Sequence, residues 1–299
     1  ILNTNSNGLI TNIGSITISD SSIFTNDATY ENLIIGNKFG TLTINGTLDN
    51  KNTLTNKGKV DISSGLLKNH LNITNDSLII ESGFLKLYKT SNLVNNDKIH
   101  IKKLTRNYGT ITNHKTILSD ANSSFENFNS INNNTNGTMT LSGSFINKIE
   151  NSSNSDSIVL TGITGTLTNH GTYTQALNKF TNDGLVTNQT TGTIINSDSV
   201  INSSSGIIQN HNLITNDSTI TNNGDIINNT SKTITNNNIF INNKLITNNG
   251  TITISHTNGN LTNNLTINNN LTIQNYGTLT IASAGTITNA STINNTKTS

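Results

Sequence analysis

The sequence predicts an all-β fold, a three-sided parallel β-solenoid with about 20 residues per coil. Two observations predict it. An aliphatic residue, one polar residue and then Asn recur three times within every stretch of about 20 residues, which is the period of a stacked repeat. Short segments with alternating apolar and polar residues are separated by Asn and Gly, which is typical of strands joined by tight turns.

The aliphatic positions fall into three columns that we expect to stack as the core. The second of these columns contains Ile220, Phe240 and Leu261. The first and third columns are predicted to form the continuous core stack, which consists of Ile226, Ile246, Ile267 and Ile287 together with Ile214, Ile234, Ile254, Ile273 and Ile293.

Asn follows most of these aliphatic residues two positions later. Side-chain amides at the same corner of successive coils can donate and accept hydrogen bonds along the stack. We therefore predict a structural Asn ladder formed by Asn222, Asn242 and Asn263 and by Asn228, Asn248, Asn269 and Asn289. In the third column the same slot contains Asn216, Asn236, His256, Asn275 and Asn295.

One unit of the repeat runs from Leu245 to Ile254. Its apolar and polar residues alternate on both sides of Asn248, Asn249 and Gly250, so two strands flank a turn. Asn-Gly pairs also occur in β-hairpins, but a hairpin meander does not predict three units in every coil.

The repeat predicts one continuous solenoid over residues 1–299. Its register is most regular over residues 165–299 and less regular over residues 1–160. We expect side loops or broadened coils over residues 84–106 and 119–157; a separate domain there is the alternative. No helix that would cap the solenoid is evident at either end, which would leave strand edges open to another chain.

The composition bounds the class of protein. The chain has 299 residues, a formal net charge of +1, 31% hydrophobic residues and no Cys. An Asn-rich chain of this kind could be disordered or amyloid-forming, but the regular placement of its hydrophobic residues favours an ordered fold. The absence of Cys excludes disulfides and thiolate metal sites, and the absence of a long apolar run predicts no membrane insertion.

The sequence predicts neither a metal site nor a cofactor, and no enzyme. Four His residues, His70, His114, His170 and His211, follow Asn at a turn position that elsewhere accepts Asp, Asn and Tyr. The pairs Asp76 and Asp97, and Asp198 and Asp217, lie about one coil apart, but Asp is also common in turns.

Two surface patterns suggest binding. The basic residues Lys86, Lys89, Lys98, Lys102, Lys103 and Arg106 could form a patch for an anionic sugar, lipid or nucleic acid, or could be a solvated strand face. Because the net charge is only +1, we expect no nucleic-acid partner. The pairs Thr251-x-Thr253, Thr278-x-Thr280 and Thr286-x-Thr288 resemble parts of an ice-binding array, although Asn, Ser and Lys interrupt the pattern.

The repeats Asn248-Asn249-Gly250-Thr251-Ile252-Thr253 and Gly285-Thr286-Ile287-Thr288-Asn289 resemble those of secreted β-solenoid surface proteins. These include the repetitive passenger regions of filamentous-haemagglutinin-like adhesins. The resemblance covers most of the chain, transfers no functional residue and implies a right-handed solenoid outside the cell.

We therefore expect a structural subunit of an extracellular or virion-surface fibre that polymerises with copies of itself, head to tail. The alternative is a surface adhesin or spacer that binds glycans or a host surface. Ice binding is a third hypothesis of a different class.

Overall fold

The computed structural model describes residues 2–3, 9–12, 14–27, 29–32, 34–35, 38–134, 136–142, 144–147, 166–175, 179–255 and 258–296. In these ranges the chain is a parallel β-solenoid with about 20 residues per turn, and no helix occurs in them. It divides into two units, residues 1–144 (unit 1) and residues 145–299 (unit 2).

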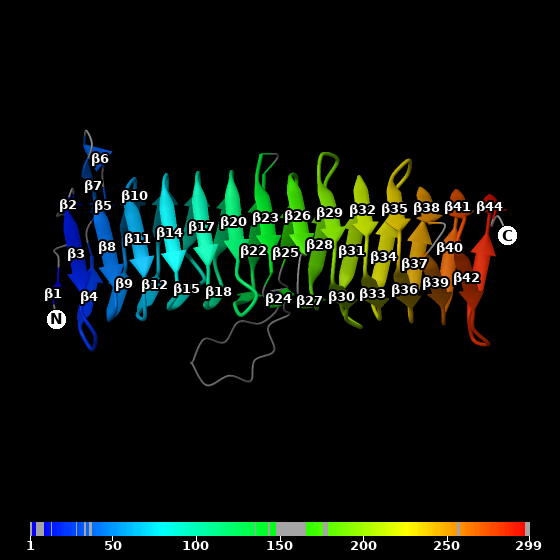
Figure 1. The fold of residues 1–299 in the computed structure, drawn as a ribbon, viewed down its shortest axis with the longest axis horizontal. Coiled ribbons are helices and arrows are strands. Elements are labelled where there is room, and N and C mark those ends of the chain that lie inside the picture. The colour runs from blue at the N-terminus through cyan, green and yellow to red at the C-terminus, as the bar shows by residue number, and fades with distance from the viewer. Residues whose placement is uncertain are drawn as a thin grey trace. The chain divides into compact units, whose positions relative to one another are not determined.

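Three parallel sheets, here named A, B and C, form unit 1 (Figure 1). Its sheet A consists of β1 (Leu2–Asn3), β4 (Ile23–Asn26), β9 (Thr47–Asn50), β12 (Leu66–Asn69), β15 (Phe84–Leu87), β18 (Leu104–Asn107) and β21 (Ser124–Asn127). Its sheet B consists of β2 (Leu9–Asn12), β5 (Thr29–Asn32), β10 (Thr53–Asn56), β13 (Asn72–Asn75), β16 (Asn92–Asn95), β19 (Thr110–Asn113) and β22 (Ser130–Asn133).

Sheet C of unit 1 consists of β3 (Ser15–Ile18), β8 (Thr41–Ile44), β11 (Lys59–Ile62), β14 (Leu78–Glu81), β17 (Lys98–Ile101), β20 (Thr116–Ser119) and β23 (Thr138–Leu141). The short strands β6 (Ile34–Ile35) and β7 (Lys38–Phe39) form a separate antiparallel pair. Residues 84–106, less regular in sequence, form β15 to β18 and pair in parallel register with the strands that follow.

Unit 2 also consists of three parallel sheets, which are again named A, B and C. Its sheet A consists of β24 (Ser144–Asn147), β27 (Lys179–Asn182), β30 (Ser199–Asn202), β33 (Thr219–Asn222), β36 (Ile239–Asn242), β39 (Asn260–Asn263) and β42 (Thr278–Ile281). Its sheet B consists of β25 (Thr166–Asn169), β28 (Leu185–Asn188), β31 (Ile207–Asn210), β34 (Asp225–Asn228), β37 (Leu245–Asn248), β40 (Thr266–Asn269) and β43 (Thr286–Asn289). Its sheet C consists of β26 (Thr172–Gln175), β29 (Thr193–Asn196), β32 (Leu213–Asn216), β35 (Thr233–Asn236), β38 (Thr251–Ile254), β41 (Thr272–Asn275) and β44 (Thr292–Asn295).

Most strands are four residues long, and their burial alternates because successive side chains point to opposite faces. The second residue points inward and is usually aliphatic, whereas the fourth points inward at the corner and is usually Asn. In β37, Ile246 and Asn248 are fully buried while Leu245 and Thr247 are partly exposed. A strand of this kind thus contributes one apolar side chain and one amide to the interior.

Glycine permits close stacking at the corner between sheets C and A of unit 1. A Cβ on Gly65 would collide with the backbone oxygen of Gly46, and one on Gly83 would collide with the backbone oxygen of Gly65. Leu66 N donates to Gly46 O at 2.8 Å and Phe84 N to Gly65 O at 2.9 Å, so these corners rest directly on one another.

We predict that Gly65→Ala lowers the free energy of unfolding by about 1–3 kcal/mol, because the added methyl group forces stacked backbones apart. The measurement is the urea midpoint of the purified protein. The matched control is Gly14→Ala, since no atom lies within 4 Å of a Cβ at that position. Equal midpoints for the two variants would contradict close stacking at this corner.

Candidate functional site

The interior Asn ladder is the most repetitive polar feature of the molecule. In sheet B of unit 2, Asn228 Nδ2 donates to Asn248 Oδ1 at 2.8 Å, Asn248 to Asn269 at 2.6 Å, and Asn269 to Asn289 at 2.7 Å. Each amide has a second hydrogen, and Asn228 Nδ2 also donates to the backbone oxygen of Thr251 at 3.1 Å. The ladder therefore links side chains to one another and to the corner backbone.

The same contacts recur in other columns. In sheet A of unit 2, Asn222 donates to Asn242 and Asn242 donates to Asn263, both at 2.8 Å. In unit 1 the donor–acceptor distances are 2.6–2.8 Å in the columns Asn26–Asn50–Asn69, Asn107–Asn127 and Asn56–Asn75–Asn95–Asn113–Asn133. These Asn side chains are buried, so each unmade hydrogen bond would leave a polar group without water.

The expected core stack is present in sheet B, where Ile226, Ile246, Ile267 and Ile287 pair in succession. In sheet C, Ile214 pairs with Ile234, and Ile273 pairs with Ile293. Ile252, however, occupies the position between Ile234 and Ile273 that we expected Ile254 to fill.

The placement of Ile254 in the core stack was wrong. Ile254 pairs with Asn236 on one side and Asn275 on the other, so an aliphatic residue interrupts the Asn column of sheet C. The reason is a local change in coil length: Asn236 and Ile254 are 18 residues apart, and Ile254 and Asn275 are 21 apart. Counting a fixed period of about 20 from Ile234 therefore selects the wrong aliphatic residue. His256, expected in the Asn slot, lies outside the described residues.

Unit 1 has a different third column. The inward fourth residues of its sheet C strands are Ile18, Ile44, Ile62, Glu81, Ile101, Ser119 and Leu141, without Asn. In sheet A, Leu87 stands between Asn69 and Asn107. These substitutions explain why the repeat was harder to recognise in the first half of the chain.

Glu81 is a buried carboxyl group in this column. Its Oε1 accepts a hydrogen bond from Leu104 N at 3.3 Å, and its Oε2 accepts one from Thr105 Oγ1 at 3.3 Å. Burial raises the pKa of Glu81 to about 8, a shift that these hydrogen bonds and the charge of Lys103 only partly oppose. The side chain is therefore mainly protonated at neutral pH.

The outer face of sheet A in unit 1 is the most distinctive surface, and we name it the cationic face. It consists of the outward residues of β12, β15 and β18, which are Leu66, Lys68, Phe84, Lys86, Leu104 and Arg106. Lys68, Lys86 and Arg106 are direct cross-strand neighbours, and so are Leu66, Phe84 and Leu104. The face therefore pairs an apolar column with a positively charged column.

An aromatic column lies at the corner that follows sheet A. His70 stacks on Tyr88 with ring centroids 4.0 Å apart, and Tyr108 stacks on Phe128 at 4.5 Å. Lys86 Nζ lies 4.8 Å from the centroid of Tyr88 and 5.8 Å from that of Tyr108. Neither this column nor Lys68 was predicted from the sequence, although each aromatic residue directly follows the last residue of a sheet A strand.

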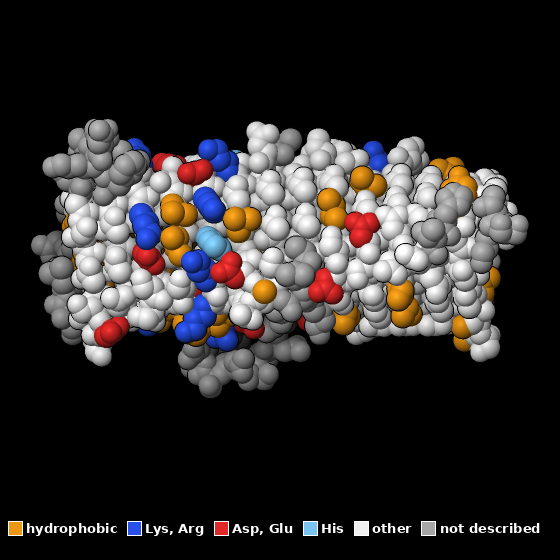
Figure 2. Space-filling model, in the orientation of Figure 1, with side chains coloured by type: hydrophobic (Ala, Val, Ile, Leu, Met, Phe, Trp, Pro, Cys, Tyr) orange, Lys and Arg blue, Asp and Glu red, His pale blue; other side chains and the backbone are white. Residues whose placement is uncertain are grey.

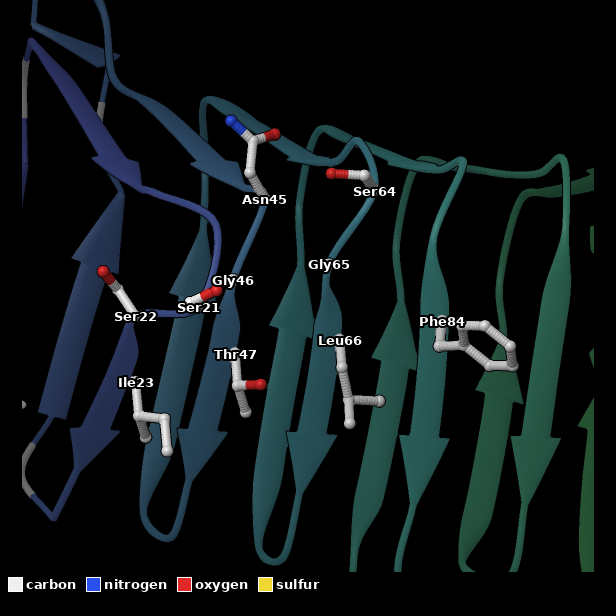
Figure 3. Close-up of a pocket in the computed structure, with 10 residues that line it drawn as sticks. All are labelled: Ser21, Ser22, Ile23, Asn45, Gly46, Thr47, Ser64, Gly65, Leu66 and Phe84. Atoms are coloured by element: carbon white, nitrogen blue, oxygen red, sulfur yellow. The ribbon is translucent and has the colours of Figure 1, made fainter.

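A shallow hollow adjoins the cationic face at the corner between sheets C and A. Figure 3 shows Ile23, Thr47, Leu66 and Phe84 side by side on successive strands of sheet A, with Asn45 and Ser64 at the corner beyond them. The hollow has a volume of about 390 Å³, and Ser21, Ser22, Gly46 and Gly65 complete its lining. Phe84 is 40% exposed, and Lys103 Nζ lies 5.5 Å from its ring centroid.

The other basic residues of the predicted patch are spread over several surfaces. Lys98 lies on the outer face of sheet C, Lys89 follows β15, and Lys102 and Lys103 lie between β17 and β18. Figure 2 shows charged and hydrophobic side chains gathered over the sheet C strands β11 to β20 of unit 1.

The His and Asp candidates have separate polar partners. His70 Nε2 lies 2.8 Å from Asp49, His100 Nε2 lies 2.6 Å from Asp120, and His114 contacts Asn134. Asp76 and Asp217 accept hydrogen bonds from Asn96 and Asn237, and Asp97 pairs with Lys115. Within the described ranges, no three His, Asp or Glu side chains lie close enough together to hold a metal ion.

The Thr pairs do not share a face. Thr251-x-Thr253 lies on sheet C, Thr278-x-Thr280 on sheet A and Thr286-x-Thr288 on sheet B. A flat array needs such pairs on one sheet in successive coils, so these three pairs together do not form one.

No protein-family model, curated protein or solved structure matches this chain. The part of the chain that the structure describes contains no helix long and apolar enough to cross a membrane.

We predict that Asn242→Ala lowers the free energy of unfolding by roughly 2–3 kcal/mol, because it removes the buried acceptor of Asn222 Nδ2 and the buried donor to Asn263 Oδ1. The adjacent Asn243→Ala is the control. Asn243 is exposed and bonds only outer side chains, so its removal should change the free energy by less than about 0.5 kcal/mol. Chemical denaturation measures both variants, and equal losses would contradict a stabilising role for the interior ladder.

We predict that stability falls as pH rises from about 4.5 to about 8, because burial raises the pKa of Glu81 and ionisation then opposes folding. The stabilisation that comes from keeping Glu81 protonated in the folded state is fully present below its ordinary pKa of 4.5. It is lost as the pH rises to the folded-state pKa of about 8, at up to about 1.4 kcal/mol per pH unit. Glu81→Gln should flatten this part of the profile of unfolding free energy against pH. An unchanged slope in Glu81→Gln would assign the pH dependence to other groups.

Proposed function

We propose that this chain is a structural subunit of an extracellular or virion-surface fibre, assembled by stacking the solenoid of one molecule on that of the next. The observation that carries the proposal is the sameness of successive coil boundaries in unit 2. From β33 to β40, boundary after boundary joins four-residue strands in register, with apolar residues on apolar residues and, on sheets A and B, Asn on Asn. A surface that repeatedly matches itself is suited to bind a second copy.

The outermost described coil of unit 2 presents such a surface. In β42–β44, Ile281 is 51% exposed and Ile293 is 37% exposed, whereas the equivalent residues Asn263 and Ile273 of the preceding coil are 0% exposed. In the proposed fibre, the first coil of a second copy buries these side chains and pairs with β42, β43 and β44. Because this contact is heterologous, it can continue into a filament.

The test is negative-stain imaging of the purified protein over a range of concentrations. We expect filaments of uniform width from the unmodified chain. Ile287→Lys should abolish them, because a charge at the stacking surface would be buried without a partner. Thr288→Lys, which places the same charge on the exposed outer side of β43, should leave them intact.

Separate particles of the unmodified protein at every concentration would reject the fibre proposal. Circular dichroism spectra of the two variants, compared with that of the unmodified protein, establish that each variant is folded. Filaments that persist in Ile287→Lys would reject this stacking surface.

The second candidate function is a surface adhesin or spacer that binds glycans. The cationic face and the adjoining hollow of unit 1 favour it, since they combine charge, exposed apolar side chains and hydroxyl groups on one surface.

A further inference from the structure

The cationic face places like charges next to one another. Lys68 is the cross-strand neighbour of Lys86, and Lys86 is the neighbour of Arg106, with strands about 4.8 Å apart. Like charges directly opposite one another on a sheet destabilise it. A column of adjacent cations on one face attracts a negatively charged ligand.

The fold itself does not require these cations. At the equivalent outward positions of sheet A in unit 2, the chain has Thr181, Ile201, Thr221, Ile241 and Thr262, which are all uncharged. The two acidic residues that border the cationic face are already paired. Asp49 contacts His70 at 2.8 Å, and Glu126 accepts a hydrogen bond from Arg106 Nε at 2.8 Å. Lys68, Lys86 and Arg106 thus form a column of three cations on the outer face of sheet A.

The hollow adds groups that suit a sugar. Leu66 and Phe84 offer an apolar floor, against which the C–H face of a sugar ring can pack. Ser21, Ser22, Asn45 and Ser64 lie around it and can exchange hydrogen bonds with sugar hydroxyl groups (Figure 3). A volume of about 390 Å³ falls within the usual range of small-ligand sites.

The aromatic column argues against nucleic acid. Proteins that bind single strands stack bases on open ring faces. Here His70 covers one face of Tyr88, and Phe128 covers one face of Tyr108, at interplanar angles of 13° and 7°. Lys86 Nζ lies over both Tyr rings.

We propose that the cationic face and its hollow bind an acidic polysaccharide. Lys68, Lys86 and Arg106 would contact the carboxylate or sulfate groups, while Phe84 and Leu66 would pack against a sugar ring. The site lies within unit 1, and its use does not depend on filament formation.

Binding by the full-length chain is to be measured by biolayer interferometry at low and at physiological salt. The probes are polygalacturonate for carboxylated sugars, dextran sulfate for sulfated sugars and neutral dextran. Oligothymidylate, polyglutamate and phosphatidylserine vesicles represent the other anionic partners. We expect at least one acidic polysaccharide to bind more tightly than every other probe, neutral dextran not to bind, and affinity to fall with salt. Tighter binding of polygalacturonate would identify carboxylate as the acidic group that is recognised, and tighter binding of dextran sulfate would identify sulfate.

Two variants test the residues. The double substitution Lys68→Ala and Lys86→Ala should weaken binding by about tenfold or more, since it removes two charge-assisted contacts. Its control is the double substitution Lys232→Ala and Lys244→Ala in unit 2, which changes the net charge equally and should have no effect. Phe84→Ala should weaken binding by roughly threefold to tenfold, consistent with loss of one buried apolar contact. Its control is Ile239→Ala, the first residue of a sheet A strand in unit 2, 39% exposed against 40% for Phe84.

Three results would overturn the proposal. These are no binding of either acidic polysaccharide at low salt, tighter binding of the oligonucleotide, polypeptide or vesicles, and full affinity in the Lys68 and Lys86 double variant. Circular dichroism and the urea midpoint establish that each variant is folded. Filament imaging of the same samples tests the fibre proposal separately, so failure of polysaccharide binding and failure of filament formation can be distinguished.

Discussion

The interior of this protein depends on satisfying the backbone at three corners in every coil. A solenoid coil must turn between short strands, and the amides and carbonyl groups at each turn are close to a dry interior. The buried Asn side chains meet this need, since Asn50 Nδ2 donates both to Asn69 Oδ1 and to the backbone oxygen of Asn52. Because an unmade buried hydrogen bond costs about 1–3 kcal/mol, the corner residue is restricted more tightly than the apolar residue in mid-strand wherever Asn fills the corner, as in most coils of sheets A and B.

This restriction explains why the sequence predicted the fold class so directly. Apolar residues replace one another in the core, as Ile220, Phe240 and Leu261 do, whereas Asn persists at Asn222, Asn242 and Asn263. The Asn therefore marks both the corner and the register. No residue in the sequence marks the handedness of the solenoid in the way that Asn marks its corners and register.

The failures of prediction have equally local causes. Ile254 was misplaced because two neighbouring coils differ in length by three residues, so a fixed period selects the wrong aliphatic residue. The aromatic column escaped notice because Tyr88, Tyr108 and Phe128 are far apart in sequence and each resembles an isolated turn residue. Only the parallel register places them one above another. The cationic face was partly visible as a run of Lys residues, but the run itself is distributed over two sheets and two corners.

The Asn ladder also has a direction. In the described columns each Nδ2 donates to the Oδ1 of the following coil, as in Asn169 to Asn188, Asn188 to Asn210 and Asn210 to Asn228. The amide dipoles in a column are therefore aligned and add, as peptide dipoles do along an α-helix. Within unit 2, each ladder amide directs its Nδ2 donor toward the following coil and its Oδ1 acceptor toward the preceding coil. Such a column distinguishes its two ends electrostatically, and it would favour anionic groups beyond the last donor and cationic groups before the first acceptor.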